Sequence, residues 1–182
     1  MGNNVEFQRT AQRLGALLAE KEIGLVYGGA KVGLMGVVAD AVMENSGVVT
    51  GVIPEFLAEH EIAHDNITKL YKVHNMHERK TLMAELSEGF IALPGGYGTL
   101  EELLEIITWA QLGLHAYPVA IINTAGYYTH LIAQLDYMVE QGLLKAKYRN
   151  LLLVGNTAEE ALELIEDKFK ENQRGLINVE DT

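Results

Sequence analysis

The hydrophobic positions along the chain follow two alternating patterns, helical spacing and short continuous apolar runs. Helical spacing, with polar residues on the opposite side, predicts helices over 5–20, 33–45, 76–87, 100–112, 127–140 and 158–170. Short apolar runs predict strands over 25–27, 48–53, 68–73, 90–93, 119–122 and 151–154. Residues 54–66 are expected to be irregular, and the polar residues from Asn172 onward to form a frayed tail.

The order of these elements predicts the fold. Short strands that alternate with helices imply crossover connections and a parallel sheet, and near-continuous apolar strands fit a sheet covered on both faces. Because there is no linker, low-complexity tract or long-period repeat, we expect one doubly wound α/β domain over 1–171 and a polar C-terminal tail over 172–182. Such sheets bind ligands beyond the carboxyl ends of their strands, where glycine-rich turns lead into helices.

Composition and charge narrow the range of partners. The chain has 182 residues, 48% of them hydrophobic, which is enough for the core of one domain. Its 14 Lys and Arg against 25 Asp and Glu give a net charge of −11, which argues against a nucleic acid or a membrane as the main partner. Without cysteine there are no disulfides, thiolate metal sites or Cys nucleophile. No membrane-span or signal-peptide pattern is present, so we expect a cytoplasmic protein with a small ligand.

Two glycine-rich turns each follow a predicted strand and open a predicted helix: Gly28-Gly29, with the residues up to Gly36, and Pro94-Gly95-Gly96-Tyr97-Gly98. Glycines there allow backbone N–H groups to approach an anion, and the helix N-terminus adds positive potential. Neither turn has the spacing of a nucleoside-triphosphate or dinucleotide motif, so ATP and nicotinamide chemistry are not indicated. For the first turn a structural and a functional interpretation are equally good, whereas the second favours function.

The residues beside the second turn allow two interpretations. Thr99-x-x-Glu102 before an apolar pair is the pattern of a capping box, in which both side chains only serve the helix end. Alternatively, Glu102 lies in the first helical turn, where its carboxylate can hold sugar hydroxyls or stabilise positive charge at C1. The pattern supports both equally. Upstream, His77-Glu78-Arg79-Lys80 fits either a site for phosphate or carboxylate or a solvated charged turn.

Histidine and tryptophan spacing raises two further alternatives. His60 with His64, and His74 with His77, have spacings seen in metal-ligand pairs. A metal site needs an additional ligand, and no H-E-x-x-H motif is present, so we expect no metal. Trp109 lies in an apolar helical segment and is expected either in the core or on a face that packs against a second subunit.

A series of ordered motifs is more specific than any single glycine turn. They are Val26-Tyr27-Gly28-Gly29, Val32-Gly33-Leu34-Met35-Gly36, Gly51-Val52-Ile53-Pro54, Met76-His77-Glu78-Arg79-Lys80, Pro94-Gly95-Gly96-Tyr97-Gly98-Thr99-Leu100-Glu101-Glu102 and Thr108-Trp109-Ala110-Gln111-Leu112-Gly113. Together, from about Asn3 to about Lys168, they resemble the LOG ("Lonely Guy") family of cytokinin riboside 5′-monophosphate phosphoribohydrolases. Members are sometimes labelled lysine decarboxylases, but no pyridoxal site is visible in this sequence.

This resemblance implies a Rossmann-like homodimer that hydrolyses the N-glycosidic bond of N6-modified AMP, or of AMP, to the free base and ribose 5-phosphate. A nucleoside monophosphate is the expected partner, with no metal or organic cofactor. By motif, Arg79 and Glu102 are the expected catalytic pair: Arg79 orients the substrate, and Glu102 stabilises an oxocarbenium-like ribose while water attacks C1′. The expected substrate-binding residues are Glu61, Lys80, Gly95, Gly96, Tyr97, Gly98, Thr99, Leu100, Glu101 and Thr108.

One departure from the family pattern concerns the first strand. Family members usually open with a strand that ends in a Gly-Ser-Ser turn, whereas this sequence starts at Met1-Gly2-Asn3-Asn4, where that strand would just have ended. Since the first strand is normally central, its absence is expected to leave a gap or two unpaired edges. Two alternatives stay open: a general nucleotide 5′-monophosphate nucleosidase, and a nucleotide-binding domain without turnover.

Overall fold

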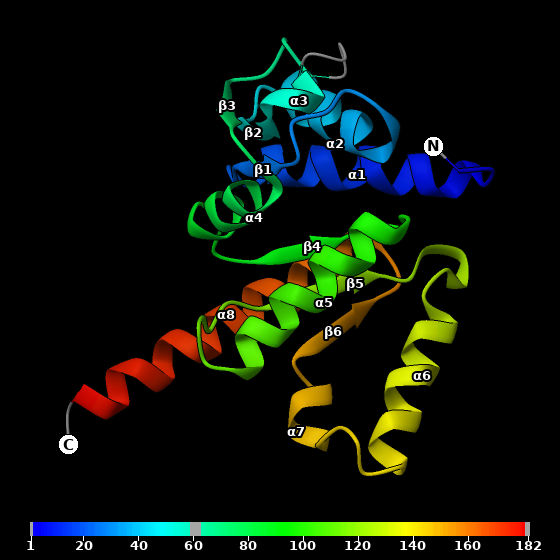
Figure 1. Ribbon diagram of the computed structural model, residues 1–182, viewed down its shortest axis with the longest axis vertical. Coiled ribbons are helices and arrows are strands. Elements are labelled where there is room, and N and C mark those ends of the chain that lie inside the picture. The colour runs from blue at the N-terminus through cyan, green and yellow to red at the C-terminus, as the bar shows by residue number, and fades with distance from the viewer. Residues whose placement is uncertain (1, 59–62, 181–182) are drawn as a thin grey trace. The chain divides into compact units, whose positions relative to one another are not determined.

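The computed structural model describes residues 2–58 and 63–180 (Figure 1). The chain falls into two compact units, Met1–Ser87 and Glu88–Thr182, each with its own three-stranded parallel sheet. The strand orders are β1-β2-β3 and β4-β5-β6, and all neighbouring strands run parallel. The prediction of parallel strands that alternate with helices is therefore confirmed. The assignment of a single domain over 1–171 stays a prediction.

The first unit is built around strand β2. Its elements are α1 (Val5–Glu20), β1 (Leu25–Tyr27), α2 (Gly33–Glu44), β2 (Val49–Pro54), α3 (Glu55–Ala58), β3 (Lys69–Val73) and α4 (Met76–Glu85). The strand β2 pairs with both neighbours and is buried along almost its whole length, as expected for a central parallel strand. Helix α2 packs on β1 and β2, α4 packs on β2 and β3, and α1 packs along α2.

The second unit is built around strand β5. Its elements are β4 (Phe90–Ala92), α5 (Tyr97–Gln111), β5 (Val119–Ile122), the 3-10 helix η1 (Thr124–Gly126), α6 (Thr129–Glu140), α7 (Ala146–Arg149), β6 (Leu152–Gly155) and α8 (Ala158–Glu180). Val119 and Ile121 of β5 join Leu103 of α5, Tyr128 and Leu152 in one buried cluster, on which α6 also packs. Helix α8 packs against β5 and β6, so all four residues of β5 are buried.

Several element boundaries differ from the predictions. Helix α5 begins at Tyr97 rather than at 100, because Gly96 in extended conformation serves as its N-cap and Gly98 lies within the helix. Helix α8 continues to Glu180, so residues 172–180 are helical rather than a frayed tail. Lys168 pairs with Glu171, and Lys170 pairs with Glu166 and Asp167, and each exposed pair stabilises this part of the helix by roughly tenths of a kcal/mol. The short helices α3, η1 and α7 have no counterpart in the predicted pattern.

The strands β1 and β4 each lie at an edge of their sheet. Among the strands of the described residues, β1 pairs with β2 alone and β4 pairs with β5 alone. In the same described ranges, no helix is long and apolar enough to cross a bilayer.

Candidate functional site

Both glycine turns lie where the sequence places them, at the carboxyl end of a strand and the start of a helix. Gly28 and Gly29 follow β1 in the first unit, and residues 94–96 follow β4 in the second unit. The expected catalytic residues are divided in the same way, with Arg79 on α4 of the first unit and Glu102 on α5 of the second. Each unit therefore contains one glycine turn and one expected catalytic residue.

In the first unit, Gly28 makes room for the guanidinium group of Arg79. A Cβ atom at position 28 would overlap Nη2 of Arg79 and lie 3.1 Å from its Cζ. The Arg79 side chain is only 8% exposed, and its Nε donates a hydrogen bond to the carbonyl oxygen of Val52 at 3.2 Å. The structure thus unites two separate sequence motifs, because the glycine after β1 and the arginine of α4 meet at the carboxyl ends of β1 and β2.

The other residues of the His77–Lys80 motif have different surroundings: Glu78 takes part in capping α4, whereas Lys80 lies next to Arg79 in the chain. Asn75 caps α4 by accepting a hydrogen bond from the Glu78 N–H at 2.9 Å. Glu78 in return accepts hydrogen bonds from the His74 N–H at 2.9 Å and from Nδ2 of Asn75 at 3.0 Å. His77 is exposed, and Lys80 is half-buried one position after Arg79. The reciprocal capping arrangement therefore lies at Asn75 and Glu78.

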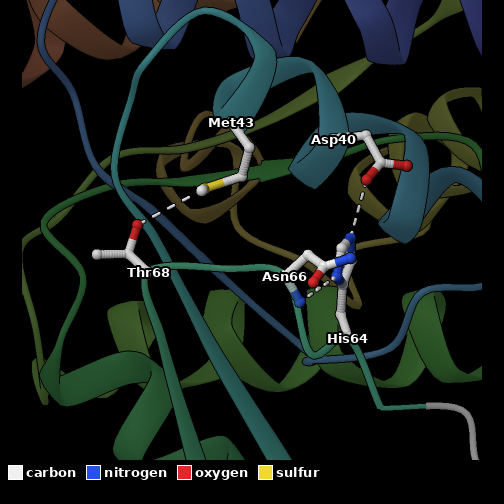
Figure 2. Close-up of polar contacts among 5 residues, drawn as sticks. All are labelled: Asp40, Met43, His64, Asn66 and Thr68. Carbon is white, nitrogen blue, oxygen red and sulfur yellow. Dashed lines mark hydrogen bonds and ion pairs between the residues drawn. The ribbon is translucent and has the colours of Figure 1, made fainter.

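The His64 ring lies between Asp40 and the backbone of Asn66 (Figure 2), and the His64 backbone lies beside the first glycine turn. Its backbone N–H donates to the carbonyl oxygen of Gly29 at 2.9 Å, and Ala63 pairs with Ala30. Its ring Nδ1 accepts from the Asn66 N–H at 3.4 Å, which leaves the proton on Nε2, 2.9 Å from Oδ1 of Asp40. His64 is thus a buried, hydrogen-bonded histidine.

Metal ligation finds no support in the described residues. Within residues 2–58 and 63–180, no group of three His, Cys, Asp or Glu side chains is arranged to hold a metal ion. His60, whose spacing from His64 raised the metal alternative, lies outside the described residues.

The tyrosine at the end of β1 is buried without a hydrogen bond. Within the described part of the chain, the Tyr27 hydroxyl has no hydrogen-bond partner. Burial, and secondarily the negative charge of Asp40, raise the pKa of this hydroxyl well above its ordinary value. Tyr27 therefore stays protonated and neutral at physiological pH.

In the second unit, the start of α5 rules out the capping-box interpretation. Gly96 is the N-cap residue, with φ −89° and ψ −154°, and it has no side chain to cap the first turn. Thr99 is the third residue inside the helix instead of its cap, so Thr99-x-x-Glu102 is not a capping box. The expectation that Glu102 lies in the first turn is also wrong, because the early start of α5 places it in the second turn.

The glycines of this loop differ in how much space surrounds them. Gly96 and Gly98 are exposed, and a Cβ built on either would meet nothing within 4 Å. The Tyr97 side chain between them is 92% exposed. At Gly95, by contrast, a Cβ would overlap Oγ1 of Thr99 and lie 2.7 Å from its Cβ. The loop is therefore packed tightly at Gly95 and open at the start of the helix.

Most of the other expected binding residues of α5 lie close to this loop. The Leu100 N–H donates to the carbonyl oxygen of Gly96 at 3.1 Å, and its side chain packs on the core cluster, so Leu100 supports the loop from inside. Glu101 is exposed and Glu102 is half-buried. Glu61 lies outside the described residues.

Thr108 is not brought together with the loop. At 1.5 Å rise per residue it lies roughly 16 Å along the helix axis from Tyr97, and about 120° around the helix from Glu102. Its hydroxyl donates to the carbonyl oxygen of Leu104 at 2.7 Å. A role for Thr108 in substrate binding stays a prediction.

Two residues that contact the loop were not predicted. The Tyr127 hydroxyl donates to the carbonyl oxygen of Gly95 at 2.5 Å, and the Tyr128 hydroxyl donates to that of Leu93 at 2.6 Å. The sequence offers one signal for these contacts, a pair of tyrosines shortly after β5, the strand that pairs with β4. Because the carboxyl ends of parallel strands meet at one edge of a sheet, polar tips there are placed to reach the loop.

Comparison with known proteins assigns the chain to a family. A family model described as "Possible lysine decarboxylase" matches residues 35–165. The cytokinin riboside 5′-monophosphate phosphoribohydrolase LOG1 of Arabidopsis thaliana is 43% identical over 173 residues, covering 95% of this chain and 81% of that protein. The phosphoribohydrolase LOG of Oryza sativa subsp. japonica is 43% identical over 176 residues, covering 97% and 73%.

A solved structure supports the fold. The molybdenum cofactor binding protein of Rippkaea orientalis superposes with a TM-score of 0.67 at 21% sequence identity, covering 90% of this chain and 88% of that one. At this identity the likeness concerns the fold alone. The sequence matches over most of the chain are the stronger finding, and they show that the protein belongs to the LOG family.

Proposed function

We propose that this protein hydrolyses the N-glycosidic bond of cytokinin riboside 5′-monophosphates, or of AMP, and releases the free base and ribose 5-phosphate. The observation that carries the proposal is the open glycine loop at the start of α5, with a carboxylate one turn further along the helix at Glu102. The named activity of relatives at 43% identity over almost the whole chain supports it.

The glycine loop is proposed to hold the 5′-phosphate. The first N–H groups of a helix have no partner within the helix, and the positive end of the helix dipole favours an anion there. Gly96 and Gly98 leave space in which an anion can reach these N–H groups. Since the protein carries a net charge of −11, a phosphate needs such a local arrangement of donors.

Glu102 and Arg79 are proposed to carry the chemistry at the ribose. Water adds to C1′ while the bond from C1′ to the base nitrogen breaks, its electron pair leaves with the base, and a proton passes from the water to the base. Positive charge builds up on the ribose during this step, and the Glu102 carboxylate stabilises it. Arg79, held by the Val52 carbonyl beside Gly28, orients the nucleotide through its guanidinium group.

A substrate panel tests the proposal. The protein is incubated with AMP, GMP, CMP and isopentenyl-AMP, and free base is separated by chromatography. Faster release from isopentenyl-AMP than from GMP and CMP would support the cytokinin reaction. Similar rates for all four would instead indicate a general 5′-monophosphate nucleosidase. AMP binding without base release would indicate a nucleotide-binding protein that lacks turnover.

Alanine at position 98 tests the phosphate site separately from the fold. Because a Cβ at Gly98 meets nothing and alanine favours a helix over glycine by about 0.5–1 kcal/mol, Gly98→Ala is expected to keep or raise the Tm. The same methyl group occupies space beside the proposed phosphate, so KM for AMP is expected to rise about tenfold or more. Gly24→Ala is the control, because a Cβ there would lie 4.0 Å from the nearest atom, and it should leave KM unchanged. An unaltered KM in Gly98→Ala would contradict this placement of the phosphate.

The proposal includes a homodimer that forms through α5. Leu104, Thr108 and Leu112 are four residues apart and lie along one side of the helix. Leu104 is 43% exposed, Leu112 is 66% exposed, and Leu114 just beyond the helix is 69% exposed. The Thr108 hydroxyl is already bonded to the Leu104 carbonyl, so it does not interrupt this apolar stripe. A row of exposed leucines is typical of a surface that packs against another protein chain.

Light scattering after size-exclusion chromatography tests the dimer. We expect the unaltered protein to have twice the mass of one chain, and Leu112→Glu to shift it to one chain because a charge would be buried in the interface. Leu143→Glu is the matched control, since Leu143 is 80% exposed but lies outside α5. A monomeric unaltered protein would contradict the dimer, and a dimeric Leu112→Glu variant would contradict its placement on α5.

A further inference from the structure

We propose that Tyr127 and Tyr128 are positioning residues for the glycine loop, and that they set the direction of its N–H donors for phosphate binding. The inference rests on the proposed function and adds two residues to it. The tyrosines lie between β5 and α6, outside the motifs that point to the catalytic pair.

The two hydroxyl groups hold the loop at two points on either side of Pro94. Tyr128 donates to the carbonyl oxygen of Leu93 at 2.6 Å, and Tyr127 donates to that of Gly95 at 2.5 Å. Tyr128 is 2% exposed, with its ring in the core cluster of the second unit. Tyr127 is 43% exposed and meets the Tyr128 ring edge-on, with centroids 5.0 Å apart and an interplanar angle of 86°. One tyrosine is therefore anchored in the core, and the other packs against it.

The turn that carries the tyrosines is itself fixed. The Asn123 N–H donates to the carbonyl oxygen of Gly155 at 2.8 Å, and Oδ1 of Asn123 accepts from the Tyr128 N–H at 2.7 Å. Ala125, which lies between Asn123 and Tyr128 in the chain, has a φ of 52°, a left-handed conformation that is uncommon for a residue with a side chain. Such strain persists only where surrounding contacts impose it, and it is often found at functional sites. Both rings are thus presented from a rigid support at the end of β5.

Holding the carbonyl groups determines where the N–H groups point. In a planar trans peptide the C=O and the following N–H point in opposite directions. The bond from Tyr127 to the Gly95 oxygen therefore directs the Gly96 N–H away from Tyr127. On the other side of the loop, Thr99 fills the space where a Gly95 side chain would lie. The peptide that leads into α5 is held from two sides, while Gly96 and Gly98 stay open.

The Tyr128 hydroxyl is suited to this role over a wide pH range. Burial, and next the neighbouring Tyr127, raise the pKa of Tyr128 well above its ordinary value. Tyr128 therefore remains a hydrogen-bond donor to the Leu93 carbonyl wherever the fold is stable at neutral or mildly alkaline pH. A phenylalanine at either position would keep the ring packing and remove only the donor.

Tyr127→Phe is the sharpest test, because it removes one hydroxyl from a partly exposed ring. Loss of one hydrogen bond that orients the phosphate donors is expected to raise KM for AMP about tenfold, with kcat within about twofold. Ribose 5-phosphate, used as a competitive inhibitor that carries the same phosphate, should lose affinity by the same factor. The Tm should stay unchanged. Tyr137→Phe, at a 54% exposed position on α6, is the matched control and should behave like the unaltered protein.

Tyr128→Phe provides an independent variant. It leaves the Leu93 carbonyl without this donor in a part-buried place, so we expect the same rise in KM together with a Tm lower by about 2–4 °C. Unaltered KM and unaltered ribose 5-phosphate affinity in both variants would overturn the inference. Absence of base release by the unaltered protein would overturn the proposed function instead, so the two failures are distinguishable.

Discussion

Replacement of Glu102 by glutamine is expected to lower kcat for base release by roughly 1,000-fold, the scale seen when one group that stabilises transition-state charge is removed. Glutamine keeps the shape and polarity of the side chain but lacks the negative charge that stabilises the cationic ribose. KM should change little, because the phosphate and the base are bound elsewhere. The measurement is steady-state release of adenine from AMP by the purified variant.

The fold is expected to survive this change. Glu102 is half-buried in the second turn of α5, and glutamine has nearly the same helix propensity as glutamate. Glu105→Gln, one turn further along the same helix, is the matched control and should keep unaltered kinetics. If Glu102→Gln were folded and released base at the normal rate, Glu102 would have no part in the mechanism.

Replacement of Gly28 by alanine is the second change with a large expected effect. A Cβ at this position would overlap Nη2 of Arg79, so the guanidinium group must move from its place beside the Val52 carbonyl. Misplacing a group that orients the substrate by about 1 Å costs on the order of 100-fold in catalytic efficiency, and we expect this fall in kcat/KM for AMP. Overpacking should also lower the free energy of unfolding by about 1–3 kcal/mol, measured by denaturant titration.

A double-mutant cycle separates displacement of Arg79 from a general loss of structure. If Gly28→Ala acts through Arg79, the double variant Gly28→Ala with Arg79→Ala should be no less active than Arg79→Ala alone. Gly24→Ala, whose Cβ would lie 4.0 Å from the nearest atom, should be fully active. Additive losses in the double variant, or normal kcat/KM in Gly28→Ala, would show that the Gly28 turn does not act through Arg79.

The elements and their order follow from the sequence because each depends on local patterns. The strand over 25–27 and the strand over 119–122 are found at their predicted residues, as is the helix over 5–20. A strand is indicated by an apolar run bounded by glycine or proline, and a helix by the spacing of its apolar residues. Both signals involve residues that are close together in the sequence. Parallel pairing follows from the alternation of strands and helices, which leaves little choice of connection.

The start of α5 differs from the prediction because intrinsic propensity and tertiary context disagree there. Because glycine is a poor helix residue, the sequence places Gly98 in the turn, and Thr99 with Glu102 then matches the pattern of a capping box. In the structure Gly96 ends the extended segment and the helix includes Gly98. The open helix end that results is itself the feature that we propose binds phosphate.

The contacts that shape the two glycine turns cannot be predicted from residues nearby in the sequence. The tyrosine hydroxyls bond to carbonyl groups 32 and 35 residues away, and nothing in their own neighbourhood indicates these partners. Likewise the need for glycine at position 28 is explained by the guanidinium group of Arg79, which reaches it from α4. From one sequence these residues could be identified as candidates by type, but their pairing depends on how the strands align in the sheet.

The most direct test of the account is the reaction of the purified protein with AMP and isopentenyl-AMP, with free base and ribose 5-phosphate both quantified. We predict that the two products appear in equal amounts and in proportion to protein concentration, and that neither accumulates with Glu102→Gln. No base release from either nucleotide, or release of phosphate and nucleoside in place of base and ribose 5-phosphate, would contradict the proposed cleavage of the N-glycosidic bond.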